Sequence, residues 1–151
     1  MKWLWLSVVI VIADQLSKAF AQQALNLFEP VRLTPYLNLT LMHNTGIAFS
    51  LFDQADARWF LVGLAAVVSV AIIVWLRFSE SNRWLQISLS LVVGGAIGNL
   101  WDRVVLGYVI DFIDFRYQTL WWPAFNIADA AICVGAAMLI IDSFKSQDAE
   151  G

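Results

Sequence analysis

The sequence predicts an all-α integral membrane protein, built as a four-transmembrane-helix bundle with a small extracytoplasmic β-sheet element. Of its 151 residues, 60% are hydrophobic and only 14% are charged, whereas a soluble domain carries about 25% charged residues. Four segments approach the roughly 20 apolar residues that a helix needs to cross a bilayer core of ~30 Å. We expect residues 1–151 to form a single integral membrane domain.

The same composition argues against other classes of protein. Soluble globular, disordered and disulfide-stabilised domains all fit it poorly. The net charge is −3 and the 9 basic residues are scattered along the chain, so no Lys/Arg patch is present to hold a phosphate backbone, and we expect no nucleic-acid partner. Cys133 is the one cysteine and can form no internal disulfide.

The first predicted span covers residues 3–20. Its basic start, its apolar run and the small residues around Ala19 also match the pattern of a cleavable signal peptide. However, Asp14 and Lys18 precede the supposed cleavage site, and three later spans already place the chain in a membrane. We therefore interpret this segment as a span.

The long connection over residues 21–58 carries the predicted β element. A loop of this length without structure is uncommon in a small domain. Its segment 36–41 reads Tyr-Leu-Asn-Leu-Thr-Leu and alternates apolar and polar residues, which is the period of a half-buried strand. We expect a small β element here, outside the membrane.

Three further spans are predicted at residues 59–76, 84–101 and 125–141. The first of these has no charged residue and is bracketed by tryptophans, as expected at the membrane interface. Gly94 and Gly98 lie four residues apart in the next span and predict close packing against a neighbouring helix. A connection over residues 103–124, rich in Asp and aromatic residues, leads to the last span.

Basic residues near the span ends orient the bundle. Cytoplasmic connections are enriched in Lys and Arg close to the spans. The two termini and the short connection carry such residues at Lys2, Arg77, Arg83 and Lys145. We therefore expect both termini in the cytoplasm and the two longer connections outside it.

Polar residues inside the spans gather at one face of the membrane. In four antiparallel helices, the extracytoplasmic ends of the first, third and fourth spans lie at the same level. These ends hold Asp14, Lys18, Asn99, Asp102, Arg103, Asn126 and Asp129. An ionisable residue within a span costs roughly 2.5–3.5 kcal/mol on insertion scales, so each one needs a partner or a function.

Local spacing suggests structural roles for several of these residues. Asp14 and Lys18 lie one turn apart, which favours an internal ion pair. Asn99 and Arg103 share one helix face and suit either a clamp on a neighbouring carboxylate or a contact with substrate. Asn126 can cap the helix that it begins.

The residue types limit the chemistry of this cluster. The single histidine, His43, which we interpret as an ordinary loop residue, cannot form a zinc site of the HExxH type, and we expect no metal and no cofactor. A Ser/Lys peptidase would pair Lys18 with an outer serine such as Ser50. Asp14 beside the lysine would keep its amine protonated, which disfavours this alternative without removing it.

Two carboxylates remain as a pair that can carry chemistry. Asp111 lies in an apolar run that leads toward the membrane surface, and Asp129 stands near the start of the next span. Two carboxylates within a few Å share one proton, so one can activate water while the other protonates a scissile carbonyl. The competing hypotheses are a small ion or proton transporter, whose sites favour the membrane midplane, and a non-enzymatic assembly subunit.

Five ordered blocks resemble the lipoprotein signal peptidases, the bacterial signal peptidase II family. They cover almost the whole chain and read DQLSK at 14–18, NTGIAF at 44–49, GGAIGNLWDR at 94–103, VIDF at 109–112 and FNIAD at 125–129. The resemblance implies a four-helix aspartic endopeptidase of the bacterial cytoplasmic (inner) membrane, with its active site at the extracytoplasmic face. Such an enzyme cleaves the signal peptide from a prolipoprotein immediately before the diacylglyceryl-modified cysteine.

The resemblance also implies roles for individual residues. Asp111 and Asp129 match the catalytic pair of the family. The positions that shape the site and hold substrate match Asp14, Lys18, Asn44, Gly46, Asn99, Arg103 and Asn126. Membrane lipid and an inhibitor of the globomycin type are the further implied partners. Ile47 departs from the alanine expected at its position.

Overall fold

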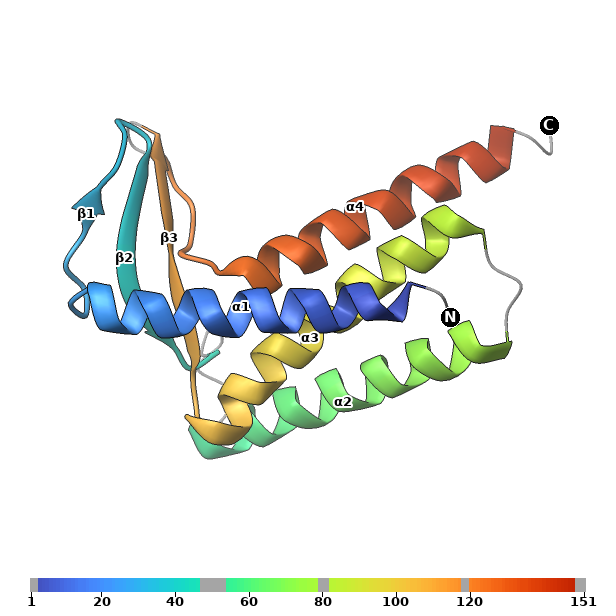
Figure 1. Cartoon of the computed structure of the whole chain (residues 1–151), viewed down its shortest axis with the longest axis horizontal. Coiled ribbons are helices and arrows are strands. Elements are labelled where there is room, and N and C mark those ends of the chain that lie inside the picture. The colour runs from blue at the N-terminus through green and yellow to red at the C-terminus, as the bar shows by residue number, and fades with distance from the viewer. Residues whose placement is uncertain (1–2, 47–53, 79–81, 118–119, 149–151) are drawn as a thin grey trace.

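The computed structural model describes residues 3–46, 54–78, 82–117 and 120–148. Its helices are α1 (Leu4–Ala24), α2 (Gln54–Phe78), α3 (Arg83–Val105) and α4 (Ile127–Asp148). Its strands are β1 (Val31–Arg32), β2 (Leu37–Asn44), β3 (Val109–Tyr117) and β4 (Leu120–Trp121). The strands pair antiparallel in the order β1-β2-β3-β4, and the sheet lies across one end of the helices (Figure 1).

Among the described residues, four helices are long and apolar enough to cross a membrane, which confirms the predicted fold class. The helices run past the predicted span limits, because a helix does not have to stop at the edge of the hydrocarbon. Helix α1 continues to Ala24, and α2 begins at Gln54. Helix α4 begins two residues later than the predicted start at Phe125, because Asn126 caps it.

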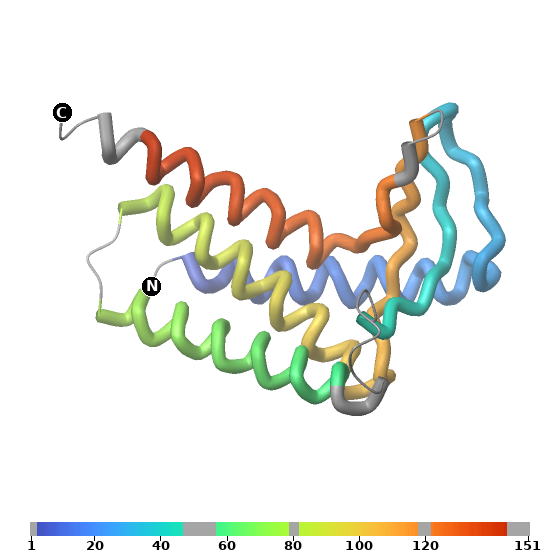
Figure 2. The backbone as a smooth tube through the Cα atoms, turned by 180° about the vertical axis from the view of Figure 1, so that it is seen from behind, coloured from blue at the N-terminus to red at the C-terminus, as the bar shows by residue number. Residues whose placement is uncertain are grey.

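Helix α3 is the centre of the bundle and packs against each of the other helices. Figure 2 shows α3 between α2 and α4, with α1 behind them. A Cβ atom added at Gly94 would lie 2.9 Å from Ile10 and from the backbone of Ser7, and one at Gly98 would lie 2.7 Å from Asp14 Oδ2. The predicted role of both glycines in close packing is confirmed.

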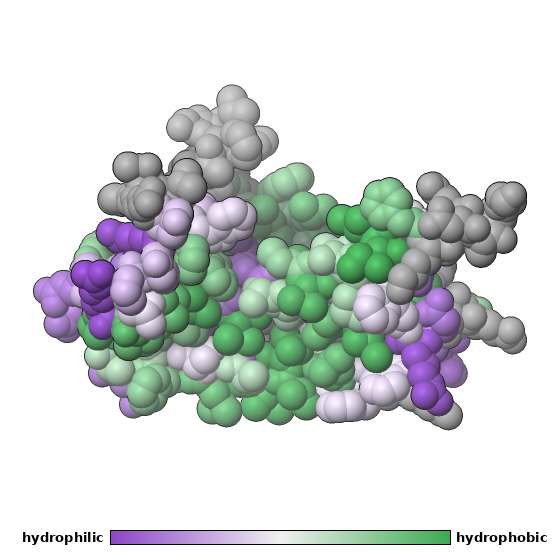
Figure 3. Space-filling view, turned by 90° about the horizontal axis from the view of Figure 1, so that it is seen from above, coloured by the Kyte–Doolittle hydropathy of each residue, from purple (hydrophilic) through white to green (hydrophobic). Residues whose placement is uncertain are grey.

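The outer surface of the helices is apolar, while polar side chains lie between them. Figure 3 shows hydrophobic residues over the middle of one face and hydrophilic residues toward its two ends. Ile12 and Val67 are more than half exposed, whereas Asp14 and Lys18 are buried. This is the distribution expected of a bundle whose middle is surrounded by lipid.

Strand β3 is the main element that the sequence analysis did not predict. It comes from the connection before the fourth span and pairs with β2, with Asp111 opposite Met42. Its first four residues are all buried, so the alternation that marks a half-buried strand is missing there. The sheet is thus built from two connections that lie far apart in the sequence.

The expectation that His43 is a loop residue is wrong. Strand β2 continues to Asn44, and His43 pairs with Ile110 while its ring stacks on Tyr108 with centroids 3.9 Å apart. The pairing of β2 with β3 shifts register between Leu39 and Met42. Such an irregularity interrupts the alternation of side chains, so the pattern ends before the strand does.

Candidate active site

The sheet end of the bundle holds all nine residues that the sequence analysis assigned to the site. Helices α1, α3 and α4 contribute Asp14, Lys18, Asn99, Arg103, Asn126 and Asp129, and the sheet and the turn after it contribute Asn44, Gly46 and Asp111. Five of them, Asp14, Lys18, Asn99, Asp111 and Asn126, are buried. Ser50 and Ile47 lie outside the described residues.

Lys18 ties α1 to α3. Its ammonium lies 2.7 Å from Asp14 Oδ2 and 2.9 Å from Asp102 Oδ2, and it donates to Asn99 Oδ1 at 3.1 Å. These three acceptors match the three N–H donors of an ammonium group. The predicted ion pair with Asp14 is confirmed, and Asp102 is a second partner that helical spacing did not reveal.

Asp102 also fixes the beginning of β3. Its Oδ1 accepts from Gln15 Nε2 at 2.8 Å, and its Oδ2 accepts from the Ile110 N–H at 3.1 Å. Ile110 directly precedes Asp111, so this bond holds the backbone that carries the Asp111 carboxylate. Sequence reasoning assigned no role to Gln15 or Asp102, although both stand inside the blocks that carried the family resemblance.

Reciprocal hydrogen bonds fix the beginning of α4. The Asp129 N–H donates to Asn126 Oδ1 at 2.9 Å, and the Asn126 N–H donates to Asp129 Oδ2 at 3.3 Å. This is the arrangement of a capping box. Asp14 Oδ1 accepts from the Ala128 N–H at 2.9 Å, so a carboxylate from α1 satisfies a further free donor of the helix.

Two asparagine amides connect the carboxylates of Asp111 and Asp129. Asn126 Nδ2 donates to Asp111 Oδ1 at 2.8 Å and to Asn99 Oδ1 at 3.1 Å. Asn99 Nδ2 donates to Asp129 Oδ1 at 2.7 Å. We call these four residues, Asp111, Asn126, Asn99 and Asp129, the carboxylate network. It joins β3, α3 and α4.

Asp111 is the buried carboxylate of the network and is 2% exposed. Its Oδ2 accepts from Asn44 Nδ2 at 2.9 Å. Burial raises the pKa of Asp111 to about 6, and the nearby Asp129 adds to the rise, while the hydrogen bonds from Asn44 and Asn126 oppose it. A carboxyl group in this environment can hold a proton close to neutral pH.

A tight turn aims the Asn44 amide. The Gly46 N–H donates to Asn44 Oδ1 at 2.9 Å, so the amide nitrogen is the group left to face Asp111. Gly46 has φ +79°, in the left-handed region that favours glycine. A Cβ atom there would also lie 2.6 Å from Leu61.

Arg103 brings positive charge to the network. Asp129 and Asp111 lie within electrostatic range of its guanidinium. In the described part of the chain, its Nη1 donates to the Asn99 carbonyl at 3.4 Å, and its buried Nε has no hydrogen-bond partner. Among the described residues the guanidinium donates no hydrogen bond to a carboxylate, so the predicted clamp on a neighbouring carboxylate is not seen there.

A groove of about 350 Å³ opens beside the network, between α2, α3 and α4. One end is polar and is lined by Asn99, Arg103 and Asp129. The remaining lining is apolar and consists of Leu61, Leu64, Ala65, Val68, Val92, Ala96 and Ile132. The groove therefore presents a carboxylate, an amide and a guanidinium at the end of an apolar channel.

The sequence matches the family model for signal peptidase II over residues 6–145. The chain belongs to the signal peptidase II family. The lipoprotein signal peptidase of Pseudomonas syringae pv. tomato is 53% identical over 150 residues, which cover 96% of this chain and 87% of that relative. That of Teredinibacter turnerae is 48% identical over 146 residues, covering 95% and 87%.

Two solved bacterial membrane enzyme structures share the fold of this signal peptidase II chain. One has a TM-score of 0.88 at 28% identity and covers 99% of this chain and 92% of its own. The other has a TM-score of 0.87 at 29% identity and covers 95% and 93%. The family and the four apolar helices together make the protein a multi-pass peptidase of the inner membrane that processes prolipoprotein signal peptides.

Proposed function

We propose that the protein is an aspartic endopeptidase that cuts a prolipoprotein immediately before its diacylglyceryl-modified cysteine, with Asp111 and Asp129 as the catalytic pair. The observation that carries this proposal is the carboxylate network itself. One continuous series of hydrogen bonds runs from the Asp111 carboxylate through the Asn126 and Asn99 amides to the Asp129 carboxylate. Asp129 also lines the polar end of the groove, where a substrate can reach it.

The two carboxylates divide the proton transfers between them. Asp111, with its pKa raised to about 6, carries the shared proton. Asp129 takes a proton from a water molecule as the water oxygen bonds to the scissile carbonyl carbon, and Asp111 protonates the carbonyl oxygen to give a gem-diol. The C–N bond then breaks as Asp129 protonates the leaving nitrogen, and Asp111 regains a proton from the gem-diol.

The groove suits the substrate proposed for it. Its apolar lining fits a signal-peptide segment within the bilayer. The lipid on the modified cysteine stays in the membrane, so the scissile bond lies near the headgroup level. Asp129 is the third residue of α4, so it lies within one turn of the sheet end of that helix, at the same level.

The remaining predicted residues support the pair in this proposal. Arg103, whose side chain lines the polar end of the groove, binds a backbone carbonyl of the substrate. Asn44 and Gly46 hold Asp111 from the sheet side. Asp14 and Lys18 shape the site from behind, because they position α4 and Asn99.

The proposed orientation places the sheet end outside the cytoplasm and both termini inside it. Arg77 is the basic residue in the last turn of α2, and Arg83 begins α3, at the opposite end from the sheet (Figure 1). Basic residues close to span ends favour the cytoplasmic side.

The contacts of Lys18 favour the carboxylate mechanism over a Ser/Lys mechanism. A catalytic lysine must face the substrate and a serine, whereas the buried Lys18 ammonium already contacts the Asp14 and Asp102 carboxylates and the Asn99 amide oxygen. The transporter hypothesis is also disfavoured, since Asn99 and Arg103 lie toward the sheet end of α3, and Asp129 is the third residue of α4, so none of the three is midway along its helix.

The proposal is tested by incubating the purified protein with a lipidated and an otherwise identical non-lipidated precursor. We expect cleavage of the lipidated precursor alone, with the modified cysteine as the new N-terminus in the product. Asp111→Asn and Asp129→Asn should each lower the rate by more than ~10³-fold while the protein still folds in membranes. Retained cleavage in either folded variant would overturn the assignment of the pair.

Inhibitors provide a second test of the reaction class. No group of three or more metal-ligating side chains occurs among the described residues. We expect EDTA to leave the rate unchanged and a globomycin-type cyclic peptide to compete with the lipidated precursor. Inhibition by EDTA that zinc reverses would contradict the proposed mechanism.

A further inference from the structure

Helix α2 supplies one wall of the groove but, among the described residues, no member of the carboxylate network. Leu61, Leu64, Ala65 and Val68 form that wall. Helix α2 packs chiefly on α3, at the edge of the bundle (Figure 2). The position of the wall therefore depends on how α2 is attached to α3.

Arg58, in the first turns of α2, attaches it to the sheet end of α3. Its Nε donates to the Arg103 carbonyl at 2.7 Å, and its Nη2 donates to the Val104 carbonyl at 2.8 Å. Both carbonyls belong to the last turn of α3, where the helix itself leaves acceptors without partners. The positive charge of Arg58 also interacts favourably with the negative end of the α3 helix dipole.

The same guanidinium fills the corner where the chain turns from α3 into β3. Gly107 has φ +90°, and a Cβ atom there would lie 3.3 Å from Arg58 Nη1. Glycine thus permits the turn and leaves room for the guanidinium. The carbonyl that accepts from Nε belongs to Arg103, which lines the groove, and Asp111 follows only four residues after Gly107.

We propose that Arg58 is a positioning residue that sets the α2 wall of the substrate groove against the end of α3. The inference rests on the proposed function, because the groove must receive the substrate. Arginine suits the role since its planar fork serves two carbonyls at once, which a lysine ammonium does less well. The guanidinium also lies 5.0 Å from the ring centroid of Trp59.

Kinetics separate this role from catalysis. We expect Arg58→Ala to raise KM for the lipidated precursor about tenfold, because two charge-assisted hydrogen bonds are lost. We expect kcat to change by less than about twofold, because the bonds of the carboxylate network do not include α2. Arg58→Lys should give an intermediate KM.

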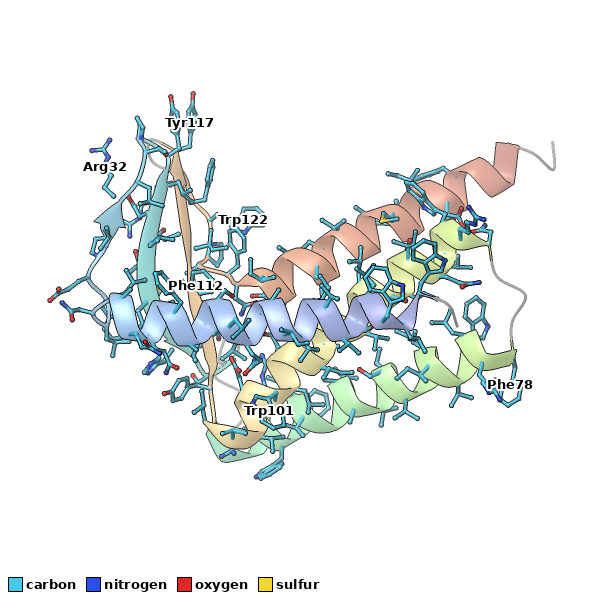
Figure 4. All side chains as sticks on the ribbon, viewed as in Figure 1. Arg32, Phe78, Trp101, Phe112, Tyr117 and Trp122 are labelled. Atoms are coloured by element: carbon cyan, nitrogen blue, oxygen red, sulfur yellow. The ribbon has the colours of Figure 1, made fainter. Side chains whose placement is uncertain are left out.

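Arg32→Ala is the matched control for the loss of one positive charge at the same end of the molecule. Arg32 donates to the Thr34 carbonyl within its own turn, and Figure 4 shows it on the outer edge of the sheet, away from the helices. This variant should keep the wild-type KM. A wild-type KM in Arg58→Ala, or an equal rise in Arg32→Ala, would overturn the proposal.

A distance measurement tests the attachment without enzyme activity. A Cβ atom added at Gly63 of α2 meets nothing within 4 Å, and Cys133 of α4 is exposed, so Gly63→Cys supplies a second spin-label site across the groove. We expect Arg58→Ala to broaden the distance distribution between the labels and Arg32→Ala to leave it unchanged. An unchanged distribution in Arg58→Ala would reject the attachment.

The two hypotheses fail differently. If the wild-type protein does not cleave the lipidated precursor, the proposed function fails, while the label distances still report on Arg58. If the wild type cleaves and Arg58→Ala matches it in both KM and label distances, only the role of Arg58 is rejected.

Discussion

Lys18 shows how a charged residue is kept inside this membrane protein. Its side chain is 1% exposed and contacts the carboxylates of Asp14 and Asp102 together with the Asn99 amide oxygen. Removing one member of a buried ion pair leaves an uncompensated charge, which is more costly than replacing the whole pair. The lysine is therefore a structural residue that also orients Asn99 toward Asp129.

We expect Lys18→Met to destabilise the protein by about 3–5 kcal/mol, because two carboxylates would remain buried without their cation. Thermal unfolding in detergent micelles measures the effect. The matched control is Gln22→Met, one turn further along α1 at an exposed position, which should unfold like the wild type. Adding Asp102→Asn to Lys18→Met should recover part of the lost stability, and a further loss would refute the charge argument.

The raised pKa of Asp111 predicts that the free energy of unfolding depends on pH. Its pKa rises from 3.8 in the unfolded chain to about 6 in the folded protein, so the folded state keeps a proton that the unfolded state has released. The contribution of Asp111 is then present below about pH 4 and is lost as the pH rises through about 6. The total loss from this group is about 3 kcal/mol.

The unfolding midpoint of wild type and Asp111→Asn, followed from about pH 4 to pH 7, isolates this contribution, because the other titrating groups are common to both. We expect the wild type to lose stability relative to the variant over this range. Parallel pH curves for the two proteins would show that Asp111 titrates normally.

At the scale of the helices, α3 determines how closely the site residues approach one another. A Cβ atom at Gly95 would meet the Ala128 carbonyl of α4, and would lie 2.7 Å from Ile132 Cγ1. Ala128 directly precedes Asp129, so this contact sets how closely α3, which carries Asn99, approaches the start of α4, which carries Asp129. Helix propensity has no part in this, since glycine is the poorest helix former after proline.

Gly95→Ala should destabilise the protein by more than about 2 kcal/mol, because the added methyl group meets backbone that cannot move aside. Gly63→Ala on α2 is the matched control. Its Cβ atom meets nothing within 4 Å, so the better helix former should stabilise the protein by about 0.5–1 kcal/mol. Equal unfolding midpoints for the two variants would contradict this account of the packing.

At the scale of the whole molecule, the groove depends on three helices and on the sheet at their end. Residues of α2, α3 and α4 line it, and β3 contributes Asp111, which accepts a hydrogen bond from Asn126 in the carboxylate network. No single element contains a complete site.

Ala65→Trp should lower kcat/KM for the lipidated precursor by more than about tenfold, because an indole on the α2 wall fills the apolar channel. Val67→Trp places the same side chain on the same helix at a position that is 68% exposed, and should leave cleavage unchanged. Both variants should insert in membranes. An active Ala65→Trp enzyme would show that substrate does not occupy the groove.

Much of the architecture was predictable because a bilayer restricts what a chain can do inside it. The helices at all four predicted spans follow from the length of apolar sequence that crosses hydrocarbon. The ion pair of Asp14 with Lys18 and the close packing at Gly94 and Gly98 follow from spacing within one helix. The strand at 109–117 was missed because it is buried and carries no alternating pattern.

The residues of the site were selected from the sequence, but their connections were not. Alternating span direction brings Asp14, Lys18, Asn99, Asn126 and Asp129 to one end, and the apolar run that leads toward the membrane surface adds Asp111, which the family resemblance also implies. Nothing local shows that Asn126 bonds both Asn99 and Asp111, or that Arg58 bonds the end of α3. Those contacts join residues from different elements, and their partners can be identified only once the elements are packed.

The sequence by itself thus determined that the protein lies in a lipid bilayer, how many helices span it and which polar residues lie near the ends of those spans. These properties depend on apolar length and on the order of residues along one helix. The tertiary structure alone decided the pairing of β2 with β3, the orientation of each amide and the position of the groove. These depend on contacts between residues as far as 114 positions apart, such as Asp14 with Ala128, which chain-local patterns do not encode.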